Sequence, residues 1–235
     1  MNFRFNRYFN HKFFSIIFYF YKIFFFKKKN LKLYGENHGK YFLPNLDKSM
    51  NNEWIISAGV GDNISFDVEM LNLGFNVIFI DPTPLAIEYF KKNFDYNLYK
   101  QNYKFYEKGL WNKKTNLRFF YSDKKVISNT ISNYNKSDQS INIETITIEN
   151  IMLENDIKTF YIIKLDIEGA ELEIVEYIFK KKIKPNYLLI EFDFLKQKNL
   201  LQAIYHFIII IKKLNKLNFK IIYIDNLNFT FKRMI

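Results

Sequence analysis

The body of the chain alternates between short apolar runs and stretches with helical spacing. The apolar runs 53–60, 76–81 and 159–167 predict buried strands, because they lack the strict alternation of a half-exposed strand. The stretches 65–75 and 171–181, which follow two of these runs, place apolar residues at helical intervals. Strands that alternate with helices predict an α/β fold with a largely parallel sheet.

The rest of the pattern extends this fold at both ends of the sheet. The runs 102–111 and 116–123 have strand character with a turn between them, and 141–148 alternates like an edge strand. The last two runs, 220–226 and 228–233, predict a closing antiparallel hairpin. The whole order is compatible with a nucleotide-binding three-layer sandwich. Other expected elements are helices at 85–94, 149–155 and 197–217, a strand at 186–193 and a surface loop at 128–140.

Length and composition indicate one folded domain of ordinary size. The 235 residues are 49% hydrophobic and 20% aromatic, which excludes a disordered chain. Cysteine is absent, so disulfides and thiolate metal sites are excluded. The three histidines are scattered without metal-ligand spacing, and we expect no metal site built on them.

The positive charge is concentrated at the N-terminus. Residues 1–30 carry seven basic residues and no acid, so they account for +7 of the net charge of +11. A nucleic-acid enzyme would spread its basic surface over the folded body. We therefore expect no nucleic-acid partner.

The N-terminal segment is aromatic as well as basic. Its apolar run 13–21 is interrupted by Lys22, which makes it too short for a membrane span, and no small-residue cleavage site follows. Two interpretations remain. The segment could lie on an anionic membrane surface, or it could be a helix that packs on the body or on a second copy. We expect a cytoplasmic protein, with membrane contact through residues 1–30 left open.

Two features after the first strands suggest a nucleotide site. Gly59 and Gly61, in SAGVGDNIS, lie between the first strand and its helix, where the backbone can approach a ligand closely. Asp81 ends the next strand, where a carboxylate can accept both hydroxyls of a ribose. Either feature alone has a simpler explanation, a tight turn or a turn-forming Asp–Pro pair. Together they lie where one adenosine could bridge them.

A third group of polar residues follows the most strand-like run. Asp166 and Glu168 lie where the carboxyl end of a parallel strand opens into a ligand crevice. This placement requires that their strand lie beside strand 53–60. The alternative is that Asp166 caps the helix that starts near Gly169, with Glu171 in the first helical turn.

At these residues the chain resembles a known family. IIKLDIEGAELEIVE resembles the signature of FkbM-type methyltransferases, and SAGVGDNISFDVEM, FIDPTP and EKGLW fall in the family's order. The resemblance covers roughly residues 50–193. It implies a Rossmann-like class I methyltransferase sheet, S-adenosylmethionine as cofactor, and hydroxyl groups of sugars or polyketides as acceptors. Residues 1–45 and the tail after 200 fall outside it. We expect a basic aromatic N-terminal segment over 1–45 and a methyltransferase domain over 46–235.

The resemblance also implies positions for the cofactor. The loop after the first strand would surround its methionine part, Asp81 would hold the ribose, and a turn at Gly109–Leu110 would lie near the adenine. The loop departs from many relatives, which have a further glycine where this chain has Asp62, Asn63 and Ser65. The expected cofactor-binding residues are Gly59, Gly61, Asp62, Asn63, Asp81, Gly109 and Leu110.

Methyl transfer to a hydroxyl is an in-line displacement, so a positioned base would assist it. We expect Asp166 as this base, Glu168 as the second candidate and Glu191 as the third. The Asp166–Glu168 pair could instead hold a divalent ion. Weaker candidates for the base are Asp193 and Lys164.

The favoured acceptor is a hydroxyl of a sugar, glycan or glycolipid precursor. Two other functions remain open. A nicotinamide-dependent oxidoreductase would share the glycine loop and the acid, and a non-catalytic membrane-peripheral binding protein could keep a degenerate sheet.

Overall fold

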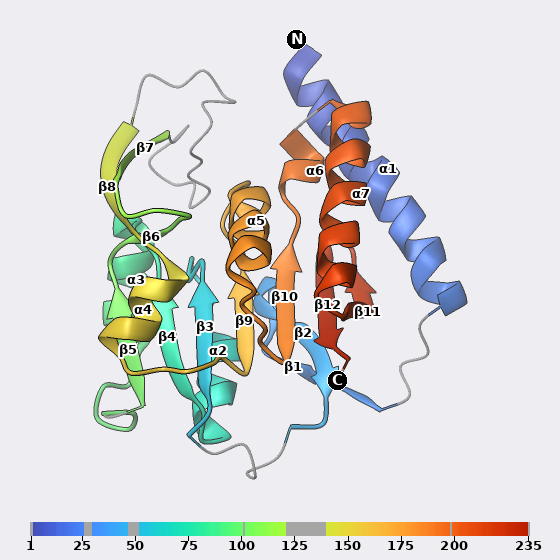
Figure 1. Ribbon diagram of the computed structural model, residues 1–235. Helices are drawn as coiled ribbons and strands as arrows, with labels where there is room; N and C mark the ends of the chain where they lie inside the picture. The colour runs from blue at the N-terminus through green and yellow to red at the C-terminus, as the bar shows by residue number, and fades with distance from the viewer. Residues whose placement is uncertain are drawn as a thin grey trace.

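The expected α/β fold is confirmed by a computed structural model that describes residues 2–25, 30–46, 52–100, 102–120, 140–197 and 199–234. A mixed sheet of seven strands crosses the molecule, and helices cover both of its faces (Figure 1). The strand order is β11-β12-β10-β9-β3-β4-β5. These strands are β3 (Trp54–Ala58), β4 (Asn76–Ile80), β5 (Tyr103–Tyr106), β9 (Ile162–Leu165), β10 (Tyr187–Glu191), β11 (Phe219–Asp225) and β12 (Asn228–Arg233).

Strand β3 lies at the point where the strand order reverses. The chain first adds β4 and β5 on one side of β3, then returns to add β9 and β10 on the other, all of them parallel. Strand β9 pairs directly with β3, with Ser57 opposite Lys164 and Ala58 opposite Leu165. The condition for a shared crevice after these two strands is therefore met. Strand β12 is antiparallel to both β10 and β11.

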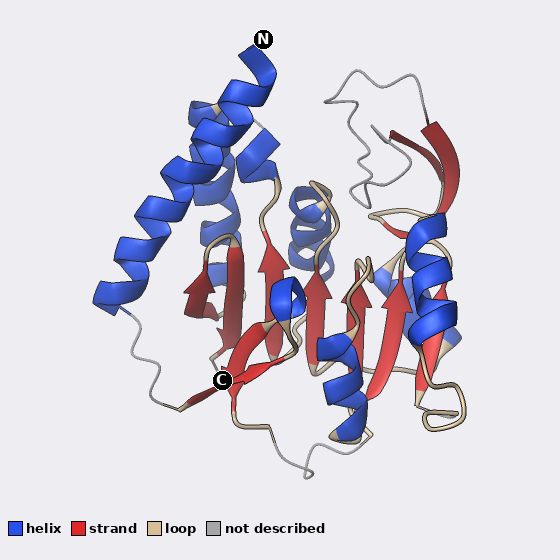
Figure 2. Ribbon diagram, turned by 180° about the vertical axis from the view of Figure 1, so that it is seen from behind, coloured by secondary structure: helices blue, strands red, loops and turns tan. Residues whose placement is uncertain are grey.

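The apolar strands are buried on both faces because helices lie on both sides of the sheet. Side chains alternate along a strand, so Ile55 of β3 faces the core beneath α2 and α3, whereas Ile56 faces the core beneath α5 and α7. Figure 2 shows α2 and α3 on the near face of the sheet. The helices are α2 (Ser65–Asn72), α3 (Pro84–Asn93), α4 (Ile148–Glu154), α5 (Glu171–Lys181), α6 (Phe194–Gln197) and α7 (Leu200–Lys216).

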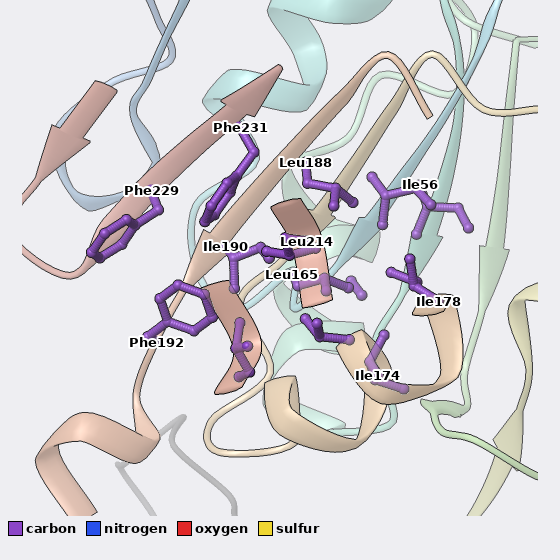
Figure 3. Close-up of a cluster of buried hydrophobic side chains, with 14 of the residues drawn as sticks. Ile56, Leu165, Ile174, Ile178, Leu188, Ile190, Phe192, Leu214, Phe229 and Phe231 are labelled. Atoms are coloured by element: carbon purple, nitrogen blue, oxygen red, sulfur yellow. The ribbon is translucent and has the colours of Figure 1, made fainter. Parts of the chain in front are cut away.

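The core beneath α5 and α7 is continuous along the sheet. Figure 3 shows Leu165 and Ile190 packed with Ile174 and Ile178 of α5, which are spaced one helical turn apart. All four side chains are fully buried. This packing fixes the start of α5 relative to the end of β9, where the candidate acids lie.

The N-terminal helix α1 (Asn2–Phe25) packs on the body along the edge next to β11 (Figure 1). Phe14 and Phe18 are buried in the core, and the Phe18 ring meets the Phe229 ring edge-on at 4.9 Å. Lys22 forms an ion pair of 2.6 Å with Asp225. No helix in the described parts of the chain is both long and apolar enough to cross a membrane.

Residues 30–46, for which no elements were predicted, also belong to the folded body. Strands β1 (Leu31–Tyr34) and β2 (Tyr41–Pro44) pair antiparallel, with the short 3-10 helix η1 (Asn37–Gly39) between them. Tyr34, Tyr41 and Leu43 are buried in the core beneath α2. The division at residue 45 stays a prediction.

Several predicted elements need correction. The run 102–111 is not one strand, because β5 joins the main sheet while β6 (Gly109–Leu110) pairs with β8 (Ser140–Ile146). Strand β8 is not an edge strand, since it lies between β6 and β7 (Asn116–Phe120) in a small three-stranded sheet. Most of the predicted helix 197–217 is confirmed as α7, while Gln197 ends the separate short helix α6. The expected loop at 128–140 lies outside the described residues except for Ser140, which begins β8.

Candidate functional site

A cavity of about 230 Å³ opens at the carboxyl ends of β3, β4 and β9. Ligands of open α/β sheets bind at this position, beyond the strand ends where the strand order reverses. The cavity brings together all seven predicted cofactor residues and two of the three acids of the KLDIEGAE block, Asp166 and Glu168. Its lining includes Gly59, Gly61, Asp62, Asn63, Asp81, Gly109, Leu110, Asp166 and Glu168.

Gly59 is required by the close approach of β3 and β9. Its φ is +87°, and an added Cβ would lie 1.7 Å from the backbone oxygen of Asp166. The Asp166 N–H in turn donates to the Ala58 carbonyl at 2.9 Å. Any side chain at position 59 would therefore push Asp166 away from the glycine loop.

Asp81 holds the glycine loop through its side chain. Its Oδ2 accepts from the N–H groups of Val60 at 2.9 Å and Gly61 at 3.1 Å. Its Oδ1 accepts from the N–H and the hydroxyl of Thr83, at 2.9 and 2.6 Å. A carboxylate has about four acceptor positions, so those of Asp81 are filled by its own chain. The sequence instead predicted that these oxygens accept hydrogen bonds from a ribose.

Asp166 lines the cavity from the end of β9. Burial, followed by the nearby Glu191 carboxylate, raises its pKa to about 7, although Lys164 opposes the shift. The N-cap of α5 is Ala170, which makes no side-chain capping hydrogen bond. The alternative reading of Asp166 as a helix cap is therefore wrong.

The turn after Asp166 carries Glu168 into the cavity lining. Glu168 and Gly169 both have positive φ, at +51° and +99°. A non-glycine residue in this conformation costs roughly 1–3 kcal/mol, and such residues cluster at functional sites.

Glu171 begins α5, as predicted, and its Oε1 accepts the Gly169 N–H at 2.8 Å. The sequence did not indicate that this carboxyl would be fully buried. Burial, followed by the charge of Asp193, raises its pKa well above the usual range. Glu171 thus fixes the turn that carries Glu168, without lining the cavity itself.

Lys164 contributes a buried cation beneath the glycine loop. Its side chain is 2% exposed, and Nζ donates to the Gly59 carbonyl at 2.9 Å and to Ser57 Oγ at 3.2 Å. On the same side lies Asp67 of α2, fully buried, whose pKa burial raises while Lys164 lowers it. Because Lys164 also lines the cavity, it balances carboxylates on two sides.

Glu191, the third predicted catalytic residue, does not line the cavity. At the end of β10 its Oε1 forms an ion pair of 2.9 Å with Lys196, which also pairs with the buried Asp193. Burial, followed by the charge of Asp193, raises the pKa of Glu191. Glu191 therefore affects the pKa of Asp166 through its charge, although it is not part of the cavity wall.

The segment before the first sheet strand forms a wall of the cavity that the sequence did not indicate. His38 and Gly39 line the cavity, and His38 Nε2 lies 2.9 Å from Asp62 Oδ1. The Asn63 side chain donates to the Glu36 carbonyl at 2.9 Å. These contacts join residues far apart in the chain, so no local sequence pattern predicts them.

Other lining residues were missed although their neighbours were named. Thr83, in the sequence DPT, supplies the hydroxyl that binds Asp81, and its position two residues after an aspartate was an available signal. Phe119 of β7 reaches the cavity from the small sheet. The turn expected at Gly109–Leu110 is the short strand β6.

The described parts of the chain contain no group of three or more histidines or acids arranged to hold a metal ion. The titratable side chains that line the cavity are instead four acids, one lysine and one histidine. In a chain with a net charge of +11, this lining favours a cationic ligand.

Comparison with protein families matches residues 18–221 to the Methyltransferase FkbM domain. The match spans most of the chain and includes the glycine loop, Asp81 and the KLDIEGAE block. Comparison with curated proteins gave no match. The chain therefore belongs to the FkbM methyltransferase family.

Proposed function

We propose that the protein is an S-adenosylmethionine-dependent O-methyltransferase whose acceptor is a hydroxyl of a sugar, glycan or glycolipid precursor. In this proposal the main sheet is a Rossmann-like class I methyltransferase sandwich closed by the β11–β12 hairpin. The strand order with its reversal at β3 and the helices on both faces support that assignment. The observation that carries the function is the placement of Asp166, a carboxyl with a pKa of about 7, beside the glycine loop in one cavity.

The residues of the cavity fit this cofactor chemically. The glycine loop at 59–63 and the acids Asp62 and Glu168 would surround the cationic methionine part, since carboxylates favour a positive ligand. Ile80, Leu110 and Phe119 offer apolar surface for the adenine.

Asp81 can take the ribose only with a local change. All of its acceptor positions are filled, and the Thr83 hydroxyl is the one partner that can leave by rotation of its own side chain. A ribose hydroxyl would then replace the Thr83 hydroxyl on Oδ1. The two backbone bonds to Oδ2 would stay and keep the glycine loop in place.

When bound, S-adenosylmethionine supplies a methyl group on a positively charged sulfur, so that transfer forms a C–O bond, breaks a C–S bond and releases one proton. Asp166 accepts that proton from the acceptor hydroxyl. With a pKa of about 7, a large share of its carboxyl is ionised at neutral pH and can act as a base. A positioned base of this kind typically contributes about 10²–10⁴-fold in rate.

Burial and then the neighbours of Asp166 set its basicity. The Glu191 carboxylate raises its pKa, while the Lys164 ammonium keeps that pKa from rising further. The ion pair with Lys196 holds the Glu191 carboxylate near Asp166 but outside the cavity. Glu168, which does enter the cavity, remains the second candidate for the base.

A ligand screen followed by product analysis tests this function. We expect S-adenosylmethionine and S-adenosylhomocysteine to raise the melting temperature of the protein, with no shift from NAD or NADP. Stabilisation by the nicotinamide cofactors alone would favour the oxidoreductase. Mass spectrometry of glycans from cells with and without the gene should then show a methyl group, on a sugar oxygen, that is present only with the gene.

A further inference from the structure

Helix α1 is apolar on two opposite faces, and only one of them is covered. The inner face packs on the core through Phe14 and Phe18. The opposite face is directed away from the core, and each of its large apolar side chains is at least half exposed. We call these side chains the outer face of α1: Tyr8, Phe9, Ile16, Tyr19, Phe20 and Ile23.

This arrangement is unusual for a surface helix. A helix that packs on a globular body normally turns polar residues to solvent, whereas a helix that is apolar all round has a second apolar environment. The outer face extends from Tyr8 to Ile23, so it runs along most of the helix. Its composition of tyrosine, phenylalanine and isoleucine suits the boundary between water and lipid.

The charge of residues 1–30 indicates what covers the outer face of α1. Residues 1–30 carry seven basic residues and no acid, and Lys12 is exposed on the same side of the helix as the outer face. A second copy of the chain packed face to face would bring two such basic segments together, and their like charges would repel. An anionic lipid surface would instead attract them.

We propose that the outer face of α1 binds the surface of an anionic membrane, with the helix lying in the plane of the headgroups. The inner face keeps the helix attached to the body, so the whole protein is held at the membrane. The N-terminus of α1 lies at the end of the molecule toward which the parallel strands of the main sheet point (Figures 1 and 2). That end also carries the cavity.

The full-length protein should be tested by co-sedimentation with lipid vesicles. We expect it to bind vesicles that contain phosphatidylglycerol much more strongly than vesicles of phosphatidylcholine alone. Raising the salt from about 0.1 M to about 0.5 M should weaken this binding, because the charges are screened. Lys12→Gln should weaken it by roughly fivefold, the effect of one basic residue near the surface.

Two variants test the apolar part. Ile16→Gln with Phe20→Gln keeps the charge and should weaken binding at least about tenfold, because two exposed apolar side chains no longer enter the lipid. Tyr19→Gln with Ile23→Gln, on the same face, should give the same result. This second pair shows that the loss of binding does not come from misfolding of the first pair. Leu153→Gln is the matched control, since Leu153 is 79% exposed on α4, away from α1, and binding should not change.

Three results would overturn the proposal. One is equal binding to the anionic and the neutral vesicles, and another is unchanged binding by both double variants. The third is a dimer of the wild-type protein that the double variants convert to a monomer, which would assign the outer face to a second copy. The assay needs neither cofactor nor acceptor, so its outcome is separate from that of the methyltransferase proposal.

Discussion

The substitution Gly59→Ala tests the geometry on which the site depends. An alanine Cβ would lie 1.7 Å from the Asp166 backbone oxygen and 2.7 Å from the Asp166 carbonyl carbon. Both atoms belong to the backbone, so the ends of β3 and β9 must move apart to make room. The displaced atoms include the residue that we assign as the base.

The magnitude follows from two costs. Placing a non-glycine residue at φ = +87° costs roughly 1–2 kcal/mol, and inserting an atom into a packed region costs about 1–3 kcal/mol more. The free energy of unfolding should therefore fall by about 2–5 kcal/mol. For a chain of this length each kcal/mol lowers the melting temperature by about 2–4 °C, so we expect a loss of roughly 4–20 °C.

The assay is thermal unfolding followed by circular dichroism, together with calorimetric titration of S-adenosylmethionine. Gly74→Ala is the control, because Gly74 has a similar φ of +93° but does not line the cavity. It should show only the backbone cost of roughly 1–2 kcal/mol and unchanged cofactor affinity. If Gly59→Ala were no less stable than Gly74→Ala, and bound the cofactor equally well, the steric argument would be refuted.

Three further predictions concern the acids around the cavity. The kcat/KM for methyl transfer should rise with pH up to about 7 and then level off, since Asp166 must lose its proton to act as the base; a profile flat through this range would exclude that role. Asp81→Ala should weaken cofactor affinity at least about tenfold in calorimetry, because the buried Val60 N–H and the partly buried Gly61 N–H lose their acceptor; unchanged affinity would contradict the role of Asp81. Glu171→Gln should raise the free energy of unfolding more at about pH 8 than at about pH 5. The reason is that a carboxyl whose pKa is raised on folding destabilises the native state as pH increases. An equal effect at both pH values would show that Glu171 is not held protonated.

The sequence predicted the part of the site that rests on regular structure. Parallel strands bring their carboxyl ends to one edge of a sheet, so the glycine loop, Asp81 and Asp166 could be placed together before their distances were known. The helix 171–181 was predicted at its observed bounds, because its apolar residues repeat with helical spacing.

The remaining parts depend on contacts between distant segments. His38 reaches the cavity only because the turn between β1 and β2 packs against the glycine loop, and neither short strand has a strong pattern of its own. Strand β8 alternates like an edge strand, yet both of its sides are paired. The alternation reports the burial of the two faces of a strand and carries no information about its hydrogen-bonding edges.

The burial of charge was also beyond the sequence. Glu171 occupies a helix position where acids are commonly solvated, but packing encloses it completely. Asp81 was placed correctly at the end of β4, whereas its four hydrogen bonds depend on where Val60, Gly61 and Thr83 lie in the folded chain.

The central claim is that Asp166 is the base of a methyltransferase that binds S-adenosylmethionine in this cavity. The most direct measurement compares wild-type protein and Asp166→Asn for cofactor affinity and for transfer of a labelled methyl group to hydroxyl acceptors. The account predicts closely similar affinities and transfer reduced by about 10²–10⁴-fold in the variant. Transfer by Asp166→Asn at the wild-type rate, or no binding of S-adenosylmethionine by the wild-type protein, would contradict it.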